Sequence, residues 1–67
     1  MFPNLEGERA KFKIKLADLA EAIGVTIGTM SLKLQGKYPI TLDEAIKIKA
    51  RIGTDMPIEE LFSEEVV

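Results

Sequence analysis

Apolar residues along this chain recur mostly at spacings of three and four, with little strict alternation. That period is typical of amphipathic helices, so the pattern predicts an all-α fold. Glycines 24, 36 and 53 each follow such a stretch, at the position where a left-handed glycine commonly ends a helix. We therefore expect several short helices that are separated by tight turns.

Capping signals place the helix boundaries. Asn4 can cap the first helix and Thr26 the third, and Thr41 forms a capping box with Glu44 at the start of the fourth. Pro57 suits the first turn of a short last helix. The predicted helices cover about 5–13, 16–23, 26–35, 42–52 and 58–62.

One domain, residues 1–62, accounts for all five helices, and 63–67 are expected to form a frayed tail. The inward-facing positions of the helices predict the core. Its expected members are Leu5, Phe12, Ile14, Leu19, Ala20, Ile23, Val25, Met30, Leu34, Leu42, Ala45, Ile46, Ile48, Ile52, Ile58, Leu61 and Phe62.

The composition narrows the class of function. The 67 residues include no cysteine and no histidine. This excludes disulfides and thiolate nucleophiles, and it removes the usual zinc and iron ligands. Histidine is also the commonest general base, so we expect no enzyme, no metal site and no cofactor. No apolar run is long enough for a membrane span, and we expect a cytoplasmic binding module.

Charge is distributed unevenly along the chain, whose net charge is −2. Residues 1–37 carry six basic and four acidic side chains, whereas 38–67 carry three basic and seven acidic ones. A polyanion would therefore meet the first half rather than the second.

Residues 16–35 form two short helices joined by a turn around Gly24, which is the plan of a helix-turn-helix. Residues 19–31, LAEAIGVTIGTMS, resemble the Cro/repressor-type helix-turn-helix regulators, which show L-A-x-x-[IL]-G-[VI]-[ST]-x-x-T-[ILV]-S. The flanking segments look like the phage-encoded branch of this family. They are MFPNL at the start, KLQGK and ITLDEA after the motif, and DMPIEELF near the end. The resemblance implies a lambda-repressor-like domain that regulates transcription by binding operator DNA as a dimer, in a bacterial cytoplasm.

The resemblance also implies a reading surface on helix 26–35. Ser31 and Gln35 can hydrogen-bond to a base edge, and Ile27 and Leu32 can touch a thymine methyl group. Several side chains are candidates for phosphate contact, although the lysines could equally be solvated and the tyrosine could equally pack. The expected DNA-binding residues are Lys15, Thr26, Ile27, Gly28, Ser31, Leu32, Lys33, Gln35, Lys37 and Tyr38.

The sequence departs from the family pattern at the start of the second helix. The family has Thr or Ser followed by Gln there, whereas this chain has Lys15, which is a poor N-cap, and Leu16. Leu16 could join Ile27 and Leu32 in an exposed apolar patch, or could lie in the core beside Leu19. The alternative function is therefore a protein-binding module, evolved or designed, that binds a partner or itself. Its expected interface is Leu16, Ile27, Gly28, Ser31, Leu32 and Gln35.

Overall fold

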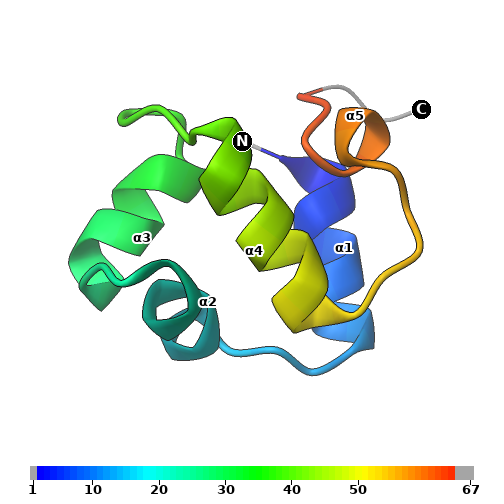
Figure 1. Ribbon diagram of the computed structural model, residues 1–67, viewed down its shortest axis with the longest axis horizontal. Coiled ribbons are helices and arrows are strands. Elements are labelled where there is room, and N and C mark those ends of the chain that lie inside the picture. Colours follow the sequence, from blue (N-terminus) through cyan, green and yellow to red (C-terminus); the bar gives the residue numbers. More distant parts are fainter. Residues whose placement is uncertain (1, 65–67) are drawn as a thin grey trace.

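The computed structural model describes residues 2–64, which contain five helices joined by loops and no strand (Figure 1). The all-α class and the number of helices predicted from the apolar period are confirmed. The helices are α1 (Pro3–Lys11), α2 (Leu16–Ile23), α3 (Ile27–Leu34), α4 (Leu42–Ile52) and α5 (Ile58–Leu61).

The capping signals of the inner helices are confirmed. Gly24 and Gly53 end α2 and α4 with φ of 73° and 81°, in the left-handed region that L side chains avoid. The Thr26 hydroxyl accepts a hydrogen bond from the Thr29 backbone N–H at 3.2 Å. At α4 the Thr41 hydroxyl and the Glu44 carboxylate bond each other's backbone N–H groups, so the capping box is complete.

The first helix differs from its prediction at both ends. Asn4 is wrong as an N-cap, because α1 begins at Pro3, whose missing N–H and fixed φ suit the first helical position. The Asn4 amide instead donates to the Glu60 carbonyl oxygen at 2.8 Å and joins α1 to α5. At the other end Lys13 has φ 57° and lies outside the helix, which ends at Lys11.

The core forms where the helices cross. α4 packs against α2 and α5, α3 packs against α2, and α1 packs against α5. The largest fully buried side chains come from all five helices: Leu5, Leu19, Met30, Ile48 and Leu61. In Figure 1, α3 and α5 lie on opposite sides of α4. The fold thus presents two separate surfaces, one on each side of α4.

Three predicted core residues are wrong: Phe12, Leu42 and Ile46 are 42%, 68% and 50% exposed. Phe12 lies at the end of α1, beyond its last helical turn. On α4 the buried stripe consists of Ala45, Ile48 and Ile52, and Leu42 and Ile46 lie about 90–130° away from its centre. Other predicted members, such as Ile14, Ile23 and Leu34, are partly buried and pack against the core.

A polar contact fixes the loop between α4 and α5. The buried Thr54 hydroxyl donates to Glu8 of α1 at 2.5 Å and accepts from the Met56 backbone N–H at 3.1 Å. The loop is therefore held against α1, and this places α5. Ser63 still bonds the Glu60 carbonyl through its backbone N–H, and residues 65–67 of the predicted tail lie outside the described residues.

Candidate nucleic-acid interface

Helix α3 is held at its N-terminus and along one side. Thr26 caps the helix with its hydroxyl, which also contacts the Thr29 hydroxyl at 3.1 Å. Met30 is fully buried and Leu34 packs against the core, so these two side chains define the inward face. The rest of the helix surface, about 80–180° away from the middle of that face, carries Gly28, Ser31, Leu32 and Gln35, and we call it the outward face.

The first turn of α3 is open to solvent. Ile27 is 54% exposed, and Gly28 is exposed. A Cβ added at Gly28 would come no closer than 4.0 Å to Thr26 Oγ1 and would meet nothing else within that distance. Gly28 is therefore not required by packing within this chain. It leaves a flat surface to which another molecule can approach closely.

Ser31 and Gln35 lie one turn apart and are already paired. The Gln35 amide nitrogen donates to Ser31 Oγ at 3.0 Å. This bond leaves three groups unused: the second amide hydrogen of Gln35, its carbonyl oxygen and the Ser31 hydroxyl hydrogen. The pair therefore presents two donors and one strong acceptor on a partly exposed surface.

A small hollow of about 200 Å³ lies beside this pair. Arg9 of α1 and Leu16 of α2 line it together with Ser31 and Gln35. Arg9 is held by Glu6, at 2.8 Å from Nη2 to Oε2, and its Nη1 donates to the Ile14 carbonyl at 3.3 Å. Its buried Nε has no hydrogen-bond partner in residues 2–64. The sequence indicates Arg9 only as one of the positive charges of residues 1–37, because no local pattern brings α1 next to α3.

Lys33 is turned away from the outward face. Its ammonium group lies 3.0 Å from Glu44 Oε1 and donates to the Pro39 carbonyl at 2.9 Å. The pKa of Glu44 lies below its ordinary value, first because its carboxylate accepts the Thr41 backbone N–H and second because Lys33 bonds to it. Lys33 thus joins α3 to the N-terminus of α4, and its charge is used within the molecule.

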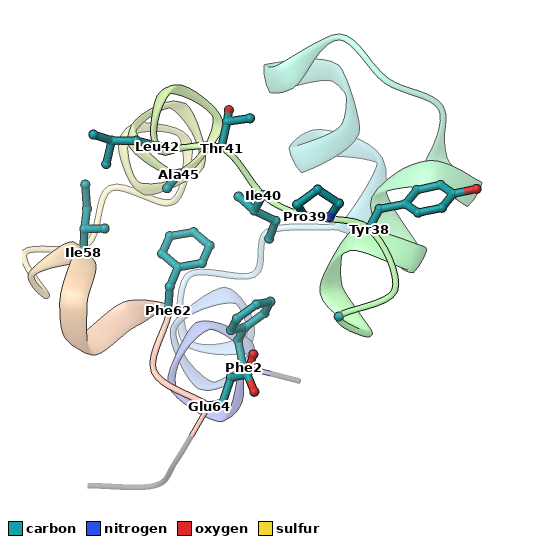
Figure 2. A pocket seen from close by; sticks show the side chains of 11 residues that line it. Phe2, Tyr38, Pro39, Ile40, Thr41, Leu42, Ala45, Ile58, Phe62 and Glu64 are labelled. Carbon is teal, nitrogen blue, oxygen red and sulfur yellow. The ribbon is translucent and has the colours of Figure 1, made fainter.

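Lys37 and Tyr38 follow α3 on an exposed turn. Gly36 takes φ 83°, and the Lys37 backbone N–H bonds the Leu32 carbonyl at 3.0 Å, which closes the helix end. Figure 2 shows the Tyr38 ring pointing away from Ile40 and Phe62, on the side of α3. No ion pair within residues 2–64 involves Lys37 or the exposed Lys15. Both lysines are therefore available to an anionic partner.

Leu16 belongs partly to the core. It is half-buried and packs against the buried cluster, as its spacing from Leu19 allowed. Leu32 is also half-buried, but it is not among the side chains that pack on that cluster. Of the three residues in the expected apolar patch, Ile27 and Leu32 lie on α3, and Leu16 borders the hollow beside Ser31.

Helix α2 begins without a hydroxyl group at its N-cap. Lys15 takes the extended N-cap conformation and its side chain makes no capping bond. The Asp18 carboxylate accepts the Lys15 backbone N–H at 3.0 Å, which supplies half of a capping box. Asp18 is in turn 3.5 Å from Arg51 of α4.

No protein-family model matches the chain, and neither a curated protein nor a solved structure shows significant similarity to it. None of the helices in residues 2–64 is long and apolar enough to cross a lipid bilayer. In the same range, no three acidic side chains gather closely enough to hold a metal ion.

Proposed function

We propose that the chain is a sequence-specific DNA-binding regulator of the helix-turn-helix type, with α3 as the helix that enters the major groove. The observation that carries this proposal is the exposed outward face of α3 behind the Gly24 turn and the Thr26 cap. In a helix-turn-helix the second helix reads base edges with its N-terminal residues. The resemblance of residues 19–31 to Cro/repressor-type regulators supports the same assignment.

The roles of the side chains follow from their chemistry. Ser31 and Gln35 read base edges through the donors and the acceptor that their mutual bond leaves free, and Ile27 and Leu32 contact thymine methyl groups. Gly28 allows close approach of the groove wall. Phosphate contacts come from Lys15, Thr26, Lys37 and Tyr38. We leave Lys33 out of this set because its ammonium is bound within the molecule.

One such domain has a small contact area, and specific protein–DNA interfaces larger than a single module bind more tightly. We therefore propose that two copies bind the two halves of a two-fold operator, about one helical turn apart.

A salt titration tests DNA binding directly. We expect the affinity for random duplex DNA, measured by fluorescence anisotropy, to fall steeply between about 50 and 200 mM salt because bound counterions are released. Lys37→Ala should reduce the slope by about one unit, whereas Lys47→Ala, whose lysine pairs with Asp43 on α4, should leave it unchanged. Absence of binding at about 50 mM salt would overturn the proposal.

A second function, a protein interface on the same helix, is favoured by the exposure of Ile27 beside the flat Gly28 surface. Exposed apolar clusters often mark protein contacts. Ile27→Asp and Leu32→Asp should then keep the fold but abolish binding to a partner or to a second copy. If neither variant changes sedimentation or pull-down of a partner, this second function is wrong.

A further inference from the structure

A second hollow, larger than the one beside Ser31 and Gln35, lies away from the outward face of α3. It is an open groove of about 540 Å³ between α4, α5 and the turn that precedes α4 (Figure 2). Most of its lining is apolar: Phe2, Ile40, Leu42, Ala45, Ile58 and Phe62. In Figure 2 the Phe62 ring lies between the Ile58 side chain and the Phe2 ring. The ring centroids of Phe2 and Phe62 are 5.6 Å apart in an edge-to-face arrangement, which is a favourable geometry for two aromatic rings.

Exposed apolar side chains border the groove on the side of α4. Leu42 lines the groove, and Ile46 lies one turn further along the same helix. These two are among the most exposed large apolar side chains in the described residues. An exposed apolar pair next to an apolar hollow is a contiguous surface of the kind that marks an interaction site.

The α5 side of the groove is acidic. Glu64 lines the groove, and Glu59 follows Ile58 on the first turn of α5. Residues 52–64 contain four acidic side chains and no lysine or arginine. No ion pair among residues 2–64 involves Glu59 or Glu64. The negative charge at this edge is therefore not paired with a basic side chain of residues 2–64.

We propose that this groove binds a basic amphipathic helix of a partner protein, whose apolar stripe packs on Leu42, Ile58 and Phe62 while its lysines or arginines meet Glu59 and Glu64. Helix-in-groove recognition uses two or three apolar anchors at helical spacing. An extended segment has no strand to join in residues 2–64. A second copy of this chain in a two-fold contact would bring a second set of the same acidic groups to the groove.

The apolar anchors of the groove, Leu42, Ile58 and Phe62, are not among the proposed DNA contacts, although Tyr38 borders both surfaces. A chain that fails to bind DNA can still bind the basic helix here. A result that contradicts DNA binding therefore does not decide whether the groove binds a basic helix, and the reverse also holds.

The test uses a synthetic amphipathic peptide of about four helical turns, made of leucine, alanine and lysine, with leucine on one face. A matched peptide has glutamate in place of every lysine. Binding to the full chain is followed by amide NMR spectra. The lysine peptide should shift the resonances of residues 40–46 and 58–64, and the glutamate peptide should bind at least tenfold more weakly. Shifts confined to α3, or equal binding of the two peptides, would overturn the proposal.

Variants locate the contact. Leu42→Ser should weaken the lysine peptide about tenfold or more, as for a truncated apolar anchor. Ile27→Ser, which changes another exposed apolar side chain on α3, should have no effect on this peptide. The double change Glu59→Gln and Glu64→Gln should weaken binding about threefold at low salt. If the chain alone sediments as a dimer that Leu42→Ser dissociates, the groove holds a second copy and the partner proposal is wrong.

Discussion

Lys33 of α3 and Glu44 of α4 form the least exposed ion pair in the described residues, with 3.0 Å between Nζ and Oε1 and side chains that are 11% and 19% exposed. Glu44 also completes the capping box of α4, and Lys33 also bonds the Pro39 carbonyl. The pair therefore joins the end of α3, the following turn and the start of α4. It holds the turn that carries Lys37 and Tyr38 in a fixed position relative to α3.

Lys33→Met should destabilise the fold by about 2 kcal/mol. The change removes the two hydrogen bonds that the Lys33 ammonium donates, and it leaves the partly buried Glu44 carboxylate without its ion pair. Lysine and methionine have similar helix propensities, so the helix itself is little affected. The matched control is Lys47→Met, which breaks the exposed pair with Asp43 and should cost less than about 0.5 kcal/mol. Urea unfolding of both variants measures the difference, and equal losses would contradict this role for Lys33.

Stability should depend on the titration of Glu44. The Thr41 backbone N–H, followed by Lys33, holds the pKa of Glu44 below its ordinary value. A carboxyl group with a lower pKa in the folded state stabilises the fold above its unfolded pKa, about 4.3, and loses that contribution as the pH falls through its folded pKa. The gap in unfolding free energy between the wild type and Glu44→Gln should therefore be largest above about pH 5 and shrink below about pH 4. Parallel pH profiles for the two proteins would show that Glu44 contributes no such dependence.

Two glycines should respond in opposite directions to the same substitution. Gly24→Ala should destabilise the fold by about 1 kcal/mol or more, because alanine is strained at φ 73°. Gly28→Ala should stabilise it by about 1 kcal/mol, because the added methyl group lies in a helix and has open space. If α3 enters a DNA groove, Gly28→Ala should also weaken DNA binding although the protein is more stable. Thermal unfolding and fluorescence anisotropy on the same samples separate the two effects.

Lys15→Ser should stabilise α2. The Lys15 side chain makes no capping bond, and Asp18 already accepts the Lys15 backbone N–H at 3.0 Å. A serine hydroxyl would complete the capping box and add about 0.5–1 kcal/mol. Lys13→Ser, in the loop before α2, is the control for the loss of one positive charge. A gain in stability that both variants share would point to charge rather than to capping.

Local sequence signals predict which segments are helical and where the inner helices begin and end. Local chemistry suffices for this, because the Thr26 cap, the Thr41–Glu44 capping box and the left-handed glycines act within a few residues of each other. The end of α1 shows the limit of such signals. Lys13 takes a left-handed conformation there without a glycine to indicate it, and the helix ends before the predicted residue.

Which apolar and charged side chains remain available for binding depends on how the helices pack together. The apolar pattern predicts that Leu42 and Ile46 join the inward stripe of α4, but the packing of α2 and α5 covers only the other edge of that helix. Lys33 lies on the helix predicted to read DNA, yet an acidic side chain eleven residues further on binds its charge. Burial and ion pairing depend on contacts between helices that are distant in sequence. The groove beside α5 and the availability of each lysine therefore follow from packing, which the local pattern of residues does not specify.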